Sequence, residues 1–189
     1  MQKNDIIPQC DEALVAMANG EREAVGVIYD CMARSIYATA IAITRNHADA
    51  EDATQDTILQ IVKYAHTYKK GSNPRAFILT IARNRALDIV RRRRSAISLD
   101  ELPLPDEAET DHLEDVLMLL SPLNECERQL VILKLYEELS YNEIAKIMKI
   151  SVFAAQKRYQ RALNKLKSIY SERRYTDERE SDKGYTQKA

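Results

Sequence analysis

The chain has 189 residues, of which 30% are charged and 45% are hydrophobic, and it contains only four glycines and five prolines. This composition is typical of a soluble, helix-rich protein and excludes an intrinsically disordered chain and a β-sandwich. The formal net charge of −1 excludes an overall electrostatic preference for nucleic acids or membranes, so such a partner has to be recognised by local concentrations of charge.

The cysteines and the longest apolar runs bear on the cellular compartment. Cys10, Cys31 and Cys126 are far apart and form no C-x-x-C pair, so we expect neither structural disulfides nor a zinc site. No N-terminal segment resembles a signal peptide, and no apolar run approaches the ~18 residues of a membrane-spanning helix. We therefore expect a cytoplasmic protein without membrane insertion.

Apolar residues in the first half of the chain recur at helical spacing. They predict a short helix over Glu12–Ala18 and longer helices from about Val25 to Ile43, from Ala50 to His66 and from Pro74 to Arg93. Asn73 supports the last of these, because asparagine is a good N-cap and proline suits the first helical position.

The composition changes between residues 100 and 115. This stretch holds eight acidic side chains, two prolines and no Lys or Arg, which predicts an extended linker. After it we expect a helix that begins at Ser121-Pro122 and ends near Glu137, followed by two more helices that end near Tyr170. The polar, aperiodic residues from Ser171 onward predict a frayed tail.

The strongest local pattern lies in Leu139–Lys167 and predicts a helix-turn-helix. Ser140 and Glu143 form a capping box for a short helix that ends near Met148, and Ser151 caps the helix after it. The second helix has a basic face opposite its apolar stripe, as expected of a helix that enters the DNA major groove. An ordinary amphipathic surface helix has such a face too, so spacing alone leaves DNA binding open.

The helix predicted after Asp49 has two different faces. One is a stripe of small and apolar residues, and the opposite face carries Leu59 among polar side chains. An apolar residue in that setting suits a docking anchor for a partner helix. Single exposed leucines are also ordinary, and acidic residues in a first turn complement the helix dipole, so the pattern alone does not decide.

The next segment, Lys69–Arg94, concentrates positive charge. It contains nine Lys and Arg residues and a single acid, Asp88. In a chain with almost no net charge, such a segment indicates a nucleic-acid surface. The alternative is that the four arginines at its end only complement the helix dipole.

Three segments together resemble a known family. DAEDATQDTILQIVKYAHTY, NPRAFILTIARNRALDIVRRRR and LSYNEIAKIMKIS, in this order and spacing, are similar to the extracytoplasmic-function (ECF) sigma factors of the sigma-70 family. The resemblance covers about Glu12–Lys167. It implies an all-α fold of two small helical domains, 1–94 and 116–170, joined by an acidic flexible linker, 95–115, and followed by a polar tail, 171–189. The second domain is implied to be a helix-turn-helix domain.

The resemblance assigns residues to three interfaces. It implies binding to the clamp helices of core RNA polymerase by Asp52, Gln55, Asp56, Leu59 and Lys63. It implies recognition and melting of the minus-ten promoter element by Lys69, Lys70, Asn73, Arg75, Phe77, Arg83, Asn84, Arg91, Arg92, Arg93 and Arg94. It implies recognition of the minus-thirty-five element by Ser151, Ala154, Gln156, Lys157, Arg158, Arg161 and Lys165.

Two departures from the family pattern affect DNA recognition. Phe77 stands where the family usually carries a tryptophan, so an aromatic side chain is kept but a smaller one. The segment Phe153–Gln156 stands where the family more often has a small residue, then Thr, Val or Ile, and Lys. The preferred upstream sequence therefore does not transfer from the family.

The function implied is that of a sigma factor, with core RNA polymerase, promoter DNA and an anti-sigma factor as partners. We expect no catalytic residue, no metal site and no cofactor, because His47, His66 and His112 are isolated and no catalytic grouping stands out. Two alternative functions would explain some of the same sequence features. One is a free-standing helix-turn-helix regulator, and the other is a sigma-like decoy that binds polymerase or an anti-sigma factor without reading promoters.

Overall fold

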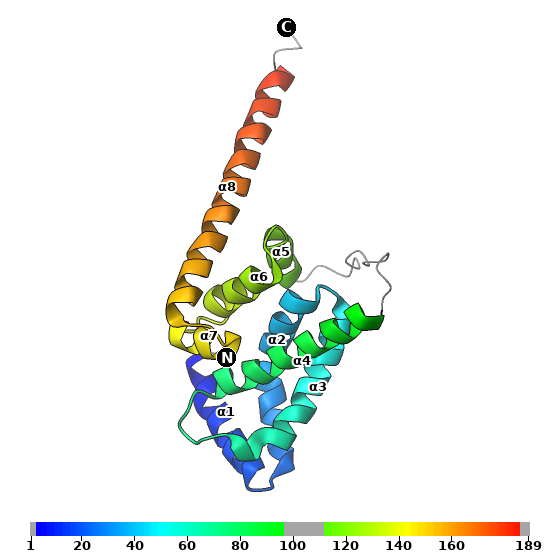
Figure 1. Cartoon of the computed structure of the whole chain (residues 1–189), viewed down its shortest axis with the longest axis vertical. Coiled ribbons are helices and arrows are strands. Elements are labelled where there is room, and N and C mark those ends of the chain that lie inside the picture. The colour runs from blue at the N-terminus through cyan, green and yellow to red at the C-terminus, as the bar shows by residue number, and fades with distance from the viewer. Residues whose placement is uncertain (1–2, 97–111, 186–189) are drawn as a thin grey trace.

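The first half of the chain folds around one central helix. The structure is a computed structural model that describes residues 3–96 and 112–185, with side chains described for 6–95 and 116–171. The first region consists of α1 (Lys3–Ala18), α2 (Val25–Thr44), α3 (His47–Tyr64) and α4 (Pro74–Ala96), with 3-10 turns at Arg22–Ala24 and Ala65–Thr67. Helix α2 packs against each of the other three (Figure 1).

Asparagines begin two of these helices. The side chain of Asn46 accepts a hydrogen bond from the Asp49 amide at 2.9 Å, and that of Asn73 accepts one from the Ala76 amide at 3.0 Å. Each bond satisfies an amide that the first turn leaves free. The predicted start of α4 is confirmed. Helix α1 begins at Lys3, well before the predicted Glu12, and its buried face is formed by Cys10, Ala13, Leu14 and Met17.

The second region consists of α5 (His112–Leu119), α6 (Glu125–Val131), a π-helical turn (Ile132–Tyr136), α7 (Tyr141–Met148) and α8 (Val152–Tyr185). The predicted helix start at Ser121-Pro122 is wrong. Asn124 instead caps α6 in a capping box: it accepts from the Glu127 amide at 2.9 Å, and Glu127 accepts from the Asn124 amide at 3.0 Å. This reciprocal pair satisfies two amides, which Ser121 followed by proline does not offer.

The helix-turn-helix prediction is confirmed. Ser140 and Glu143 form the expected capping box at the start of α7, and Lys149 ends that helix in the left-handed conformation. The Ser151 hydroxyl accepts a hydrogen bond from the Ala154 amide at 3.1 Å and so caps α8. Leu139 and Ile144 are buried beside the turn.

The predictions for the acidic linker and for the C-terminal tail have different outcomes. Most of the predicted acidic linker, residues 97–111, lies outside the described residues, and from His112 the backbone is already helical. The predicted frayed tail is wrong for the backbone, since α8 continues to Tyr185 (Figure 1). Extending an existing helix avoids the cost of nucleation, and seven of the fourteen residues in 172–185 are Glu, Arg or Lys, which are good helix formers.

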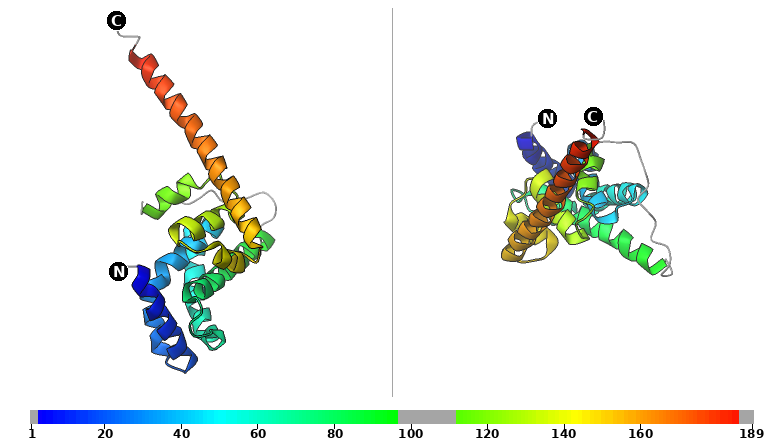
Figure 2. Two further views of the ribbon diagram at one scale, coloured as in Figure 1. Left: turned by 90° about the vertical axis from the view of Figure 1, so that its left-hand side faces the viewer. Right: turned by 90° about the horizontal axis from the view of Figure 1, so that it is seen from above.

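The two regions pack against each other. Helix α4 contacts α7, α2 contacts α6, and the buried apolar residues of both regions form one continuous cluster. Figure 2 shows α6 and α7 lying against the first region while α8 projects away from it. Every element described between residues 3–96 and 112–185 is helical, so the predicted all-α class is confirmed.

The cap of α6 gives a test of this fold. We expect Asn124→Ala to lower the free energy of unfolding by about 1 kcal/mol, because the Glu127 amide in the first turn loses its acceptor. Asn142→Ala, an exposed position in α7, is the matched control and should stay within about 0.5 kcal/mol of the original chain. Urea unfolding followed by circular dichroism measures both. Equal stability of the two variants would contradict the capping role.

Candidate nucleic-acid and partner interfaces

Helix α3 has the two faces that the sequence predicts. Ala50, Ala53 and Ile61 are buried against the first region, whereas the Leu59 side chain is 66% exposed. The residues around Leu59 that lie on the exposed face are Asp52, Gln55, Asp56, Lys63 and His66. A large apolar side chain ringed by charges of both signs is a suitable anchor for a partner, because burying it there removes apolar area from water.

The cationic loop between α3 and α4 is fixed by a residue that the sequence analysis missed. The Asp11 carboxylate in α1 accepts hydrogen bonds from the Tyr68 hydroxyl at 2.5 Å and from the Gly71 amide at 2.9 Å. These two bonds lower the pKa of Asp11, and burial together with Asp11 raises the pKa of Tyr68 to about 12. Gly71 has a φ of 76°, which suits glycine. These hydrogen bonds therefore tie the loop between α3 and α4 to helix α1.

This loop presents its two lysines to solvent. Lys69 and Lys70 are exposed, and the Tyr68 ring packs on Phe77 with ring centroids 5.2 Å apart. Phe77 is therefore only half-exposed. Cations and an aromatic ring lie together here, which is the combination that single-stranded nucleic acids favour.

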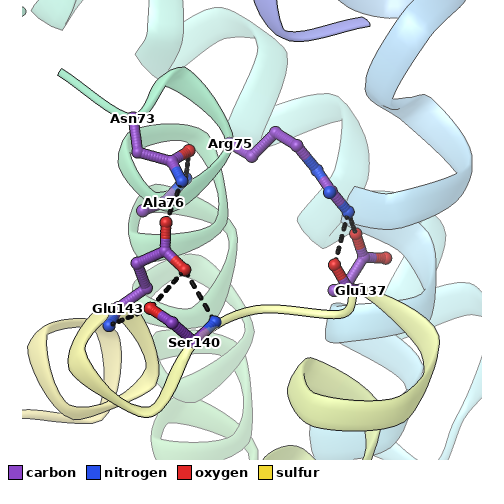
Figure 3. Close-up of polar contacts among 6 residues, drawn as sticks. All are labelled: Asn73, Arg75, Ala76, Glu137, Ser140 and Glu143. Carbon is purple, nitrogen blue, oxygen red and sulfur yellow. Dashed lines mark hydrogen bonds and ion pairs between the residues drawn. The ribbon is translucent and has the colours of Figure 1, made fainter. Parts of the chain in front are cut away.

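The first turns of α4 are held by the second region (Figure 3). The Arg75 guanidinium donates to the Glu137 carbonyl at 2.9 Å and to its carboxylate at 2.5 Å, and the two side chains are 10% and 1% exposed. The Asn73 amide nitrogen donates to the Glu143 carboxylate. Further along the same helix, Arg83 donates to the Gln129 side chain at 2.8 Å. Three of the predicted DNA-binding residues are thus engaged within the chain.

Glu143 has two roles in this contact. Burial raises its pKa, but hydrogen bonds from Ser140 and Asn73 and the nearby Arg75 charge outweigh burial and lower it overall. Glu143 is therefore ionised at neutral pH. The same carboxylate caps the helix-turn-helix at α7 and binds the N-cap residue of α4 (Figure 3).

The other predicted residues of α4 are arranged differently. Arg91, Arg92 and Arg94 are exposed at the C-terminal end, whereas Arg93 forms an ion pair with Asp49 of α3 at 2.7 Å. Asn84 is half-buried. Arg91 pairs with Asp88 at 2.8 Å and Arg94 with Glu125 at 3.6 Å, but both side chains are 72% exposed and so remain accessible to a phosphate backbone. Arg93 braces α4 against α3.

The recognition helix of the predicted helix-turn-helix has an open basic face. Ala155, Tyr159 and Ala162 are buried, and the predicted residues on the opposite face are exposed: Gln156, Lys157, Arg158, Arg161 and Lys165. Ala154 is half-buried and Ser151 is the N-cap. The basic face is consistent with the expected surface for DNA.

Phe153 belongs to this surface but was not among the predicted residues. It lies in the first turn of α8, its side chain is 71% exposed, and the Lys157 ammonium lies 5.8 Å from its ring centroid. The sequence signal was present, since Phe153 departs from the family pattern. An aromatic side chain at the exposed N-terminal end of a recognition helix is placed to contact base edges.

Two other features bear on the kind of site that the chain could hold: clusters of metal-ligating side chains and membrane-spanning helices. Within residues 3–96 and 112–185, no three His, Cys, Asp or Glu side chains come together as a metal site would require. No helix in the described part of the chain is both long and apolar enough to cross a membrane. Cys10, Cys31 and Cys126 are free thiols in the structure.

Two family models match the chain, one in each of its two regions. Sigma-70 region 2 matches residues 28–96, and sigma-70 region 4 matches residues 113–166. The ECF RNA polymerase sigma factor SigK of Mycobacterium sp. (strain KMS) is 25% identical over 171 residues, which cover 84% of this chain and 89% of SigK.

Two solved structures are also similar. CnrH in complex with the cytosolic domain of CnrY has 20% identity and a TM-score of 0.67, covering 86% of this chain and 97% of CnrH, and it supports the fold alone. The sigma factor RpoE from Bartonella quintana, in complex with the anti-sigma factor NepR, has 25% identity and a TM-score of 0.63, covering 76% of this chain and 94% of RpoE.

The Asp11 contact to the cationic loop leads to a prediction. Asp11→Ala should accelerate amide hydrogen exchange in residues 68–73 at least several-fold, because the Gly71 amide and the Tyr68 hydroxyl both lose a charged acceptor. Glu12→Ala, the exposed neighbouring carboxylate, is the control and should leave exchange in this loop unchanged. Hydrogen exchange with mass spectrometry measures both variants. Unchanged exchange in Asp11→Ala would mean that the loop is held by other contacts.

Proposed function

The chain belongs to the ECF sigma factors of the sigma-70 family, and from this we propose that it directs core RNA polymerase to specific promoters and starts transcription there. It does so as a non-catalytic subunit that recognises two promoter elements and helps to melt the duplex. The observation that supports this best is the succession of sigma-70 region 2 and region 4, with an exposed docking face in the first and an exposed basic recognition helix in the second. Acting with polymerase, the protein works in the cytoplasm.

The polymerase-binding surface proposed is the exposed face of α3. Leu59 is the apolar anchor, and the surrounding polar residues Asp52, Gln55, Asp56 and Lys63 supply charge complementarity. Anchors of this kind carry most of the binding energy of an interface, while their charged surroundings set orientation and association rate.

The minus-ten surface proposed follows the loop after α3 and the length of α4. Lys69, Lys70 and the arginines at the end of α4 neutralise phosphates, a contribution that falls as salt rises. Asn73, Phe77 and Asn84 contact the extruded base of the non-template strand, with Arg75 and Arg83 beside them. The minus-thirty-five element is read by the first turns of α8.

We also propose an anti-sigma factor as a partner. Its support is the similarity to RpoE, which is solved in complex with an anti-sigma factor. The exposed apolar side chains of the second region that are available to such a protein include Met118, Leu119 and Leu135.

Run-off transcription with core polymerase on a random promoter library tests the proposed function directly. We expect enrichment of promoters with two separated elements, recovered only in the presence of this chain. A free-standing repressor or a decoy would enrich no promoter. The selected promoter then serves in the tests below.

Leu59→Asp tests the docking face. We expect the free energy of unfolding to change by no more than about 0.5 kcal/mol, because the side chain is exposed. Binding to core polymerase should weaken by at least ~2 kcal/mol, roughly thirtyfold, because a charge replaces the anchor. Pull-down with core enzyme and thermal melting on one preparation measure both effects.

The matched control is Val27→Asp, which places the same charge at an exposed apolar position of α2. It should leave polymerase binding unchanged. If both variants lose binding equally, the loss is a general effect of added charge. If neither does, the docking surface lies elsewhere.

Phe153 is proposed to contact a thymine methyl group of the upstream element, since apolar side chains pack on that group in the major groove. Replacing those thymines with deoxyuridine removes only the methyl. The original chain should then lose about 0.8 kcal/mol, roughly fourfold, for each methyl that it buries. Phe153→Ala should bind the normal promoter more weakly and be indifferent to deoxyuridine.

Gel-shift and transcription assays with the holoenzyme measure this pair of changes. Leu135→Ala, an exposed apolar residue away from α8, should respond to deoxyuridine as the original chain does. Equal sensitivity of the original chain and Phe153→Ala to deoxyuridine would show that Phe153 does not read the methyl.

A further inference from the structure

A carboxylate of α1 holds the loop that carries Lys69 and Lys70. Asp11 accepts hydrogen bonds from the Tyr68 hydroxyl at 2.5 Å and the Gly71 amide at 2.9 Å, and these donors are 57 and 60 residues away in the chain. Hydrogen bonds to an ionised acceptor are about twice as strong as those between neutral groups. Asp11 lies outside the residues 28–96 that match sigma-70 region 2. The loop thus depends on a residue that none of the proposed interfaces includes.

The loop is also closed on itself. The Ser72 amide and hydroxyl both donate to the Lys69 carbonyl, at 3.0 and 2.7 Å. The Tyr68 hydroxyl lies 2.8 Å from the Ser72 carbonyl, so this tyrosine touches both α1 and the end of the loop. These contacts engage backbone groups of the turn and leave the side chains of Lys69 and Lys70 exposed. The turn therefore forms without any contribution from the charges of its two lysines.

Tyr68 connects this anchor to Phe77 of α4. The Tyr68 side chain is 9% exposed, and its ring packs on that of Phe77 with the centroids 5.2 Å apart and the planes tilted by 60°. Such a tilted arrangement of two rings is a favourable one. Because the hydroxyl of Tyr68 is held by Asp11, one carboxylate supports both the cationic turn and the aromatic ring beside it.

The charge of Asp11 does not itself favour DNA. Hydrogen bonds from Tyr68 and Gly71, together with the nearby charge of Lys70, outweigh burial and lower the pKa of Asp11, so the carboxylate is ionised at neutral pH. A negative charge beside a surface for nucleic acids repels phosphates. Asp11 can therefore favour DNA binding only through the shape that it gives the loop.

We propose that Asp11 is a positioning residue for capture of the extruded minus-ten base: without touching DNA, it holds the loop and the Phe77 ring in the arrangement that receives the base. The identity of that base site rests on the proposed function. A loop that is already ordered loses less conformational entropy when a strand binds, so it binds the strand more tightly. Helix α1 is in this way part of the promoter-reading apparatus.

Asp11→Ala in the holoenzyme tests this role. The probe is a fluorescent oligonucleotide with the non-template minus-ten sequence selected by run-off transcription, either intact or with an abasic site at each position in turn. With the original chain we expect a roughly tenfold loss at the extruded position, as for one stacked base. Asp11→Ala should bind the intact oligonucleotide roughly tenfold more weakly and lose little more at any abasic position. Removal of a negative charge alone would have the opposite effect, tighter binding.

Three further variants separate position from charge. Asp11→Asn removes the charge but keeps the oxygen that accepts both bonds, so it should restore sensitivity to the abasic site. Tyr68→Phe keeps the ring on Phe77 and removes the hydroxyl, so it should weaken binding in the same direction as Asp11→Ala. Glu12→Ala removes an exposed carboxylate from the next residue and should bind the intact oligonucleotide no more weakly than the original chain.

All variants are compared below their melting temperatures and at equal occupancy of core polymerase, which Asp11→Ala should bind as the original chain does. A general loss of stability would weaken binding to intact and abasic strands by the same factor. The proposal is overturned if Asp11→Ala and the original chain lose equal factors at every abasic position. If the original holoenzyme selects no promoter, the proposed function fails and this inference fails with it. Equal factors in a holoenzyme that does select promoters contradict the positioning role alone.

Discussion

Glu137 sits at the junction of the two regions with only 1% of its side chain exposed, and it forms an ion pair with Arg75 at 2.5 Å. Burying a carboxylate in such a place is costly without a cation close by, and arginine is suited to it because its planar fork binds two oxygens at once. The position of the second region therefore depends on the start of α4. Asn73, two residues earlier, is brought to Glu143 by the same packing. The residues proposed for the minus-ten element and the helix-turn-helix are consequently held by one set of contacts.

The sequence predicted those features that depend on neighbours in the chain. The exposed face around Leu59, the Asn73 cap and the capping box of Ser140 all follow from spacings of three or four residues, and all are confirmed. The predicted start at Ser121-Pro122 is wrong, because the reciprocal capping box of Asn124 and Glu127 sets the start of α6. A serine followed by proline and an asparagine-glutamate pair are both local signals for a helix start, and here the pair with reciprocal hydrogen bonds forms the cap.

The sequence did not predict the contacts between residues that are far apart in the chain. Asp11 binds Tyr68 across 57 residues, and Arg75 binds Glu137 across 62. Neither carboxylate differs from its neighbours in any local pattern, so only the tertiary packing identifies it. The same packing changes the interpretation of α4: a run of cations that suggests one open DNA surface is divided into buried, braced and exposed arginines. The salt-dependent attraction that we propose for DNA therefore rests on the exposed arginines and not on the buried one.

This division separates the proposed surfaces. The faces of α3 and α8 are exposed, and the partners proposed for them are a protein helix and an intact duplex, neither of which needs melted DNA. Asn73, Arg75 and Arg83, which we propose to act on a separated strand, are instead engaged by the second region. Glu143 belongs to both sides of this contact, because the carboxylate that caps the helix-turn-helix also accepts a hydrogen bond from the N-cap residue of α4.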